Sequence, residues 1–271
     1  MKNKLSRFAV PYVVWMALFV VAPIVIMVVY AFAGSDGGFT LDNFVQMGGY
    51  AAVFGRSFKL ALIATAICLL MGYPVAYLLS REGESFRRTA MVLIMLPMWM
   101  NFLLRTIAWM SLLEDQGLIN QVLRFLGFEG AQLMYNSGAV LLGMVYNFLP
   151  FMVFPIYTVL SKQDPKLGEA AQDLGCNEWR TLVKVTMPLS LPGVISGITL
   201  VFMPSVTTFF IPRVLGGGNT VMFGDLIESK FLTEGNWNVG SALSLIMMVL
   251  ILISLSILRK ADPKGEGGGI A

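Results

Sequence analysis

Histidine is absent from the 271 residues, and only 13% of them are charged, about half of the ~25% that is usual in soluble domains. Histidine is the commonest general base and metal ligand, so its absence argues against an enzyme and against a metal site. No Gly-x-x-x-x-Gly-Lys-Ser/Thr loop occurs, which excludes ATP hydrolysis by the P-loop route. The net charge is only +3 and there is no dense Lys/Arg tract, so nucleic acid is not an expected partner.

Apolar residues, in contrast, make up 56% of the chain, and the mean hydropathy is +0.74. They gather in six runs of roughly 20 residues, the length that spans about 30 Å of hydrocarbon as a helix. The runs cover Ala9–Ala33, Leu60–Leu79, Ala90–Leu113, Ala139–Leu160, Leu191–Pro212 and Ser241–Leu258. The first run is too long for a signal peptide and is expected to remain as a helix. The sequence therefore predicts an all-α membrane protein with about six transmembrane helices.

The basic residues are distributed unevenly between the predicted loops. Thirteen of the 19 Lys and Arg residues fall in the two terminal segments, the 81–88 loop and the 161–190 loop. By the positive-inside rule these segments are cytoplasmic, and the loops 34–56, 114–137 and 213–240 lie outside. We therefore expect both termini in the cytoplasm and one transmembrane domain over 1–262. The Gly-rich residues 263–271 are expected to form a flexible cytoplasmic tail.

The cytoplasmic loop 161–190 contains start and stop signals for two short helices. Asp164 followed by Pro165 predicts a helix start, and Gly175 predicts its end in a left-handed turn. Asn177 can cap a second helix, which Pro188 is expected to interrupt before the fifth span. Apolar stripes run along both helices: Leu167, Ala170, Ala171 and Leu174 in the first, and Trp179, Leu182 and Val183 in the second. Such an amphipathic pair lies on the membrane surface or docks another protein, and composition leaves both open.

The spacing in this loop resembles the EAA signature of ABC-importer permeases. The matching residues are Glu169-Ala170-Ala171, Gly175, Val185 and Met187-Pro188. The resemblance implies a coupling helix that sits in a cleft of an ATPase subunit, so that closure of two ATPase copies switches the permease between two states.

The resemblance also implies a role for each residue of the signature. Glu169 would orient the docking and Gly175 would make the turn, while Ala170 and Ala171 would form the contact surface. Asp173, Leu174 and Pro188 belong to the same coupling segment. The alternative for Glu169 is a solvated first-turn carboxylate that the helix dipole favours.

A wider resemblance covers nearly the whole chain. The stretches 101–123, 147–164, 209–232 and 236–245 resemble the permease subunits of spermidine/putrescine importers, the PotB type. The Arg-Thr-x-Ala-Trp set that starts at Arg105 and the Pro-x-x-Leu-Gly-Gly set that starts at Pro212 are the clearest parts. The resemblance implies the type I ABC importer permease (MetI-like) fold in the inner or plasma membrane of a prokaryote.

The same resemblance implies partners rather than a bound cofactor. The expected partners are two copies of an ABC ATPase, which hold ATP and Mg, and a second permease subunit that is a different chain. An extracytoplasmic substrate-binding protein and membrane lipid complete the set.

A polyamine is a polycation, so its path should offer carboxylates and aromatic faces. The candidates near the outer mouth are Glu114, Asp115, Asp225 and Glu228, with Trp109 and Tyr146 as the aromatic faces. Solvated surface charges are the alternative for the carboxylates, and a place in the interfacial aromatic belt is the alternative for Trp109.

Arg105 is a charge inside the third predicted span, which marks a functional candidate. It could extend to the outer surface, form an ion pair with an acid such as Glu114, or repel cations, and we favour the ion pair. Asn101 and Asn147 could bond to neighbouring helices or line the path, and we favour the bond between helices.

Two other function classes remain open. The first is an ABC permease for sulfate, molybdate, ferric iron, thiamine or phosphonate. Arg213, which stands where the polyamine type commonly has an acidic residue, slightly favours an anionic cargo. The second is a membrane scaffold or enzyme outside the ABC class, which the lack of paired carboxylates or a nucleophile–base set disfavours.

Overall fold

The computed structural model describes residues 10–34 and 38–261. Among these residues, regular structure is entirely helical apart from one isolated bridge between Ala33 and Phe39. Five helical stretches are long and apolar enough to cross a membrane, and a bent pair supplies a sixth. They are Val10–Phe32, Asp42–Arg81, Ser137–Leu160, Glu178–Thr207 and Trp237–Ile257, with Glu84–Trp99 and Phe102–Phe125 as the pair. The all-helical class and the count of about six are confirmed, whereas Ala9, the predicted start of the first run, lies outside the described residues.

The chain divides into two compact units. The first comprises Met1–Ala52 and Leu226–Ile253, and the second comprises Val53–Asp225 and Ser254–Ala271. The predicted domain limits, 1–262 and 263–271, stay a prediction, and residues 262–271 are outside the described part of the chain.

In the first unit, asparagine side chains hold the end of α2 (Ala22–Phe32). Asn43 Nδ2 donates to the carbonyl oxygens of Ala31 and Ala33, both at 3.0 Å, and Asn238 Nδ2 donates to Ala33 O at 3.0 Å. These bonds satisfy carbonyl groups that a helix end leaves without partners. The other elements that contribute to this unit are η1 (Ala17–Val21), α3 (Asp42–Val45), η2 (Gln46–Tyr50), α13 (Phe223–Leu232) and α14 (Trp237–Ala261).

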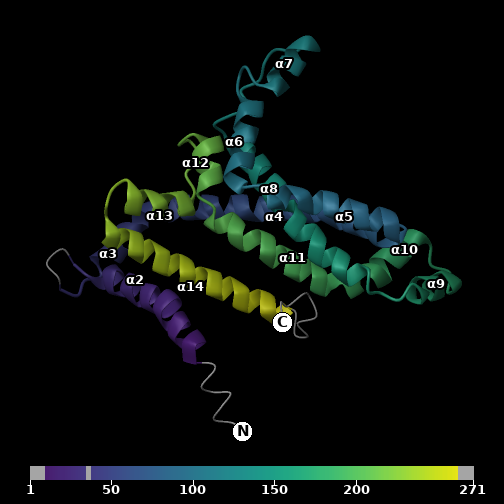
Figure 1. The fold of residues 1–271 in the computed structure, drawn as a ribbon, viewed down its shortest axis with the longest axis horizontal. Helices are drawn as coiled ribbons and strands as arrows, with labels where there is room; N and C mark the ends of the chain where they lie inside the picture. The colour runs from purple at the N-terminus through teal and green to yellow at the C-terminus, as the bar shows by residue number, and fades with distance from the viewer. Residues whose placement is uncertain (1–9, 35–37, 262–271) are drawn as a thin grey trace, which may run out of the picture. The chain divides into compact units, whose positions relative to one another are not determined.

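The second unit contains the helices that carry the candidate site (Figure 1). Its long helices are α4 (Ala51–Arg81), α5 (Glu84–Trp99), α8 (Ser137–Leu160) and α11 (Met187–Thr207). The shorter elements are α6 (Phe102–Leu113), α7 (Leu118–Phe125), α9 (Lys166–Asp173), α10 (Glu178–Thr181), η3 (Leu182–Thr186) and α12 (Phe210–Gly216).

Two glycines allow α11 to pack closely on α8. A Cβ at Gly193 would lie 2.8 Å from the carbonyl oxygen of Pro155, and a Cβ at Gly197 would lie 2.7 Å from Sδ of Met152. Membrane helices commonly use such a pair of small residues, four apart, to approach one another. The contacts also show that α8 and α11 are antiparallel, since residue numbers fall on α8 as they rise on α11.

By the same test, α4 and α8 run in the same direction. Cys68 Sγ lies 3.8 Å from Val145 O, and a Cβ on Gly72 would contact Met152, so residue numbers rise together on the two helices. The chain must therefore cross back between Arg81 and α8, and the pair α5–α6 makes this crossing. The predicted cytoplasmic placement of the termini, which lie outside the described residues, stays a prediction.

The third span, expected over Ala90–Leu113, consists of two helices. It breaks after α5, and the helical axes of the pair meet at 91°. Pro97 lies in the last turn of α5, Met100 is extended with φ −78° and ψ 147°, and Asn101 Oδ1 accepts from Leu103 N at 2.8 Å as the cap of a new helix. A proline followed by a capping residue ends one helix and starts another. Asn101 is thus a helix cap.

The fifth span also differs from the prediction. Pro188 does not interrupt it, because α10, η3 and α11 form one helical stretch, Glu178–Thr207. The turn before Pro188 is π-helical: Met187 N donates to Leu182 O, five residues back. A wider turn accommodates a residue that has no N–H and a bulky ring. At the other end the helix stops at Thr207, so Pro212 belongs to α12 and not to the span.

Candidate functional site

The predicted left-handed turn after α9 is present. Gly175 has φ +87°, its N–H donates to Gln172 O at 2.8 Å, and Cys176 N donates to Ala171 O at 3.0 Å. These two bonds form a Schellman motif, in which a residue with positive φ ends the helix. A side chain other than that of Gly would be strained at this position.

The two predicted helix starts are also present. Asp164 Oδ1 accepts from Lys166 N at 3.0 Å at the start of α9. Asn177 Oδ1 accepts from Arg180 N at 2.8 Å at the start of α10. Side chains and the glycine turn thus fix both ends of the segment between the two helices, which gives it a defined shape.

The apolar stripe of α9 is divided between two faces. Ala171 is buried against the rest of the unit, whereas Ala170 is exposed and Leu174 is 88% exposed. On the next helix, Trp179 is 68% exposed. Large apolar side chains exposed on an otherwise polar loop are typical of a surface that contacts another protein or a membrane.

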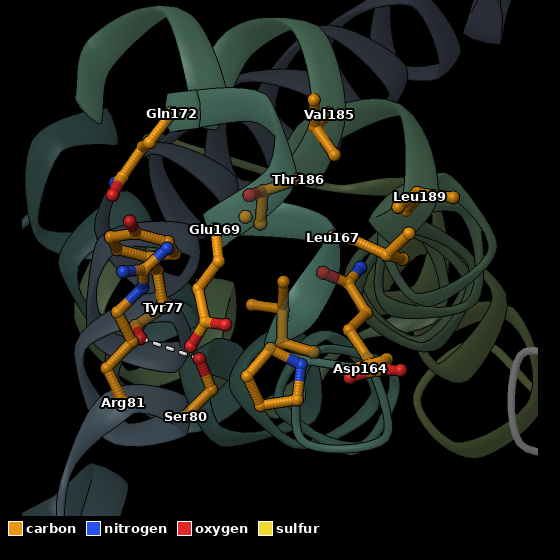
Figure 2. A pocket seen from close by; sticks show the side chains of 14 residues that line it. Tyr77, Ser80, Arg81, Asp164, Leu167, Glu169, Gln172, Val185, Thr186 and Leu189 are labelled. Carbon is orange, nitrogen blue, oxygen red and sulfur yellow. Dashed lines mark hydrogen bonds between the residues drawn. The ribbon is translucent and has the colours of Figure 1, made fainter. Parts of the chain in front are cut away.

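Glu169 lies beside a cavity of about 360 Å³ between α9 and the ends of α4, α8 and α11. Figure 2 shows its side chain pointing toward Ser80, at the end of α4. Ser80 Oγ donates to Tyr77 O at 2.7 Å, and the Arg81 guanidinium lies 4.8 Å from the centroid of the Tyr77 ring. Within the described residues the side chain of Glu169 forms no hydrogen bond or ion pair, so its carboxylate remains available to a cationic partner.

Two of the predicted path residues come together. The rings of Trp109, on α6, and Tyr146, on α8, pack edge to face at 5.3 Å. Glu114 and Asp115 are exposed at the end of α6, and the carbonyl oxygen of Asp115 accepts from Arg124 Nη2 at 3.1 Å.

The remaining two path candidates, Asp225 and Glu228, are half-buried on α13. Residue 225 belongs to the second unit and residue 228 to the first. The six path candidates therefore stay a prediction.

An ion pair joins Lys230 and Glu234 in the first unit. Lys230 Nζ lies 2.6 Å from Glu234 Oε2 and 5.2 Å from the centroid of the Tyr50 ring. The hydrogen bond to Glu234 raises the pKa of Lys230 above its usual range. The stabilisation is complete below the ordinary Lys pKa and is lost only as the pH rises through the raised value, so it persists throughout the neutral range.

Arg105 does not form the ion pair with Glu114 that we favoured. Its side chain is buried in α6, and neither Nε nor Nη1 has a hydrogen-bond partner among the described residues. Asn147 does not bond to a neighbouring helix either, because its Nδ2 donates to Gly143 O of its own helix at 2.8 Å.

Three structurally important residues were not predicted. The Gly-x-x-x-Gly spacing of Gly193 and Gly197 is a sequence signal that could have identified the α8–α11 contact. Ser205, which is fully buried on α11, carries no such signal, because Ser is common in membrane helices.

Comparisons with known proteins identify a family of transport components. The family described as "Binding-protein-dependent transport system inner membrane component" matches residues 69–264. Among similar proteins is the spermidine/putrescine transport system permease protein PotB of Haemophilus influenzae, with 34% identity over 96% of this chain and 95% of the relative. The protein of the same description in Escherichia coli K12 is 33% identical over 92% of this chain and 94% of the relative.

Solved structures show the same fold at low sequence identity. A bacterial ABC transporter involved in the import of the acidic polysaccharide alginate contains a chain with TM-score 0.75 and 17% identity, covering 96% of this chain and 94% of that one. The alginate transporter in complex with an alginate pentasaccharide-bound periplasmic protein gives TM-score 0.78 and 16% identity, covering 98% and 96%. The family match over most of the chain, the relatives above 30% identity and this fold lead to one conclusion: the protein is a multi-pass membrane permease that belongs to the family of binding-protein-dependent transport system inner membrane components.

Proposed function

We propose that this chain is the permease subunit of an ATP-driven importer of spermidine and putrescine in a bacterial inner membrane. The observation that carries the proposal is the similarity to PotB permeases of several bacteria at 33–34% identity over more than nine-tenths of the chain. The relatives are transport permeases and not enzymes. The names of these relatives do not favour sulfate, molybdate, ferric iron, thiamine or phosphonate as the cargo.

The exposed residues of α9 and α10 support the coupling role. Leu174, Trp179 and Ala170 present an apolar surface, and Glu169 stands beside it with an unpaired carboxylate. In the proposed complex two ATPase copies, which hold ATP and Mg, bind this surface and its counterpart on a second permease chain. An extracytoplasmic binding protein delivers the cargo. ATP-driven closure of the ATPases then moves α9 and α10, and with them the continuous stretch that leads into α11.

The test is cargo-stimulated ATP hydrolysis by the purified complex in lipid nanodiscs. The chain is co-expressed with its ATPase, a second permease and the binding protein, and challenged with spermidine, putrescine, sulfate, molybdate, ferric iron, thiamine and phosphonate. We expect stimulation by the polyamines alone. Stimulation by another cargo would contradict the polyamine assignment, and a complex that cannot form with any ATPase would contradict the coupling role.

A further inference from the structure

Five polar side chains of the second unit have buried atoms without a hydrogen-bond partner among the described residues. Two of them, Gln163 and Thr181, belong to the loop that carries α9 and α10, and the other three lie in the helices outside that loop. They are Arg105 on α6, Asn147 on α8 and Ser205 on α11, with exposed fractions of 8%, 3% and 0%. The unpartnered atoms are Nε and Nη1 of Arg105, Oδ1 of Asn147 and Oγ of Ser205. All three residues lie in helices that form membrane-crossing stretches. Polar groups at such positions carry a large free-energy cost unless they face water, a ligand or another polar group.

The antiparallel packing places Ser205 near the level of Asn147. Gly197 on α11 lies against Met152 on α8. Eight residues further along α11, Ser205 reaches the level of roughly residue 144 or 145 on α8, within about one helical turn of Asn147. The amide nitrogen of Asn147 donates to Gly143 O. Its Oδ1 therefore remains a free acceptor, close to the level of the Ser205 hydroxyl group along the helices.

Two aromatic contacts place Arg105 in the same region. On one side of it, Phe102 packs against Phe210 of α12 with ring centroids 5.6 Å apart. On the other side, Trp109 packs against Tyr146, the neighbour of Asn147, at 5.3 Å. Arg105 is about one turn from each contact, so it lies on the part of α6 that packs between these contacts with α8 and α12.

We propose that Arg105, Asn147 and Ser205 form a hydrated transit site, where the ammonium groups of the cargo exchange water for protein oxygens during passage. Asn147 Oδ1 and Ser205 Oγ accept hydrogen bonds from the N–H groups of the cargo. Arg105 is a fixed like charge that keeps the affinity low, because a site in a conduction path must also release what it binds. The proposed hydration of the site is argued from the unpartnered atoms, whereas its polyamine chemistry rests on the proposed function.

Cysteine accessibility tests the hydration and the contact with cargo. Cys68→Ala and Cys176→Ser give a cysteine-free chain, into which Ser205→Cys or Asn147→Cys is introduced in the assembled transporter. A membrane-impermeant methanethiosulfonate is applied during ATP turnover. Leu200→Cys, on α11 and 48% exposed where lipid would lie, is the matched control. We expect both buried positions to react at least ten times faster than Leu200→Cys and to be protected by spermidine.

The outcomes separate this inference from the proposed function. Failure of both buried cysteines to react would overturn the hydrated site. Reaction without protection by any cargo that stimulates ATP hydrolysis would overturn the transit role. Protection by a cargo other than a polyamine would keep the site and overturn the polyamine function.

Substitution of Arg105 tests its role as a repelling charge. We expect Arg105→Gln to lower the KM for spermidine about three- to ten-fold, since a like charge at close range is removed, and to slow turnover because release becomes slower. Arg105→Lys keeps the charge, so its KM for spermidine and its turnover rate should stay near those of the parent transporter. If Arg105→Gln leaves KM unchanged in correctly assembled transporter, or if Arg105→Lys behaves like Arg105→Gln, the repelling role is wrong.

Discussion

The coupling segment of α9 and α10 and the buried centre of α6, α8 and α11 depart from ordinary burial in opposite ways. The first exposes Leu174 and Trp179 on a polar loop, and the second conceals polar atoms of Arg105, Asn147 and Ser205 in apolar helices. In proteins at large, an exposed apolar patch or a buried polar group carries more information than the reverse arrangement.

This difference in burial indicates what kind of partner each region lacks. The ends of the helices in the coupling segment are already fixed by Asp164, Gly175 and Asn177, so its main need is a surface that covers the exposed side chains of Leu174 and Trp179. The buried centre is well covered but lacks hydrogen-bond partners. A rigid protein such as an ATPase could cover the apolar side chains of the coupling segment, and water or a small polar cargo could supply hydrogen-bond partners to the buried centre.

The largest effect is expected for Gly175→Val. A β-branched residue at φ +87° is strained by about 1–2 kcal/mol or more, so the turn between α9 and α10 should change shape. We expect cargo uptake to fall on the order of 100-fold. When Gly175→Val is combined with Ser205→Cys, the introduced cysteine should keep its accessibility to the thiol reagent in the resting transporter.

The control for this variant is Gly168→Ala in the same helix. A Cβ there would meet only Thr181 Cγ2, at 3.9 Å, and Ala favours a helix over Gly. Uptake should therefore stay near that of the parent. Normal uptake by Gly175→Val would show that the shape of the turn is not needed for coupling.

The sequence predicted the coupling segment better than the spans because its structure is determined locally. Asp164, Gly175 and Asn177 act on residues within a few positions, and all three were assigned correctly. The bend after Pro97 and the continuity of the helix through Pro188 depend on how the neighbouring turns adjust, and a proline alone does not distinguish a break from a π-helical turn. The placement of Ser205 and Arg105 depends on contacts between helices, for which only the Gly193–Gly197 spacing gave a local signal.

An intermediate effect is expected for Leu174→Asp. The side chain is almost fully exposed, so the fold and the membrane insertion should not change, but a charge would be buried when the ATPase covers this face. We expect about ten-fold less ATPase to co-purify with the permease, as measured by quantitative blotting of the complex in nanodiscs. Lys184→Ala, an exposed polar position in η3, should retain the ATPase, and equal loss in both variants would contradict a specific apolar contact.

The smallest effect, and the sharpest test of the comparison, is expected for Asn147→Leu. Leu has the same branching of side-chain heavy atoms as Asn, with larger methyl groups, and has no unpartnered oxygen. The substitution therefore removes a destabilising buried acceptor at the cost of one hydrogen bond to Gly143 O. Because the loss of the bond and the relief of the acceptor nearly offset each other, thermal unfolding of the permease in detergent should shift by no more than a few degrees, upward if the relief dominates. Uptake should nevertheless fall several-fold, since the cargo loses an acceptor. A stability loss large enough to explain the fall in uptake would mean that Asn147 is structural, and the contrast with the exposed coupling segment would then reduce to a difference in burial alone.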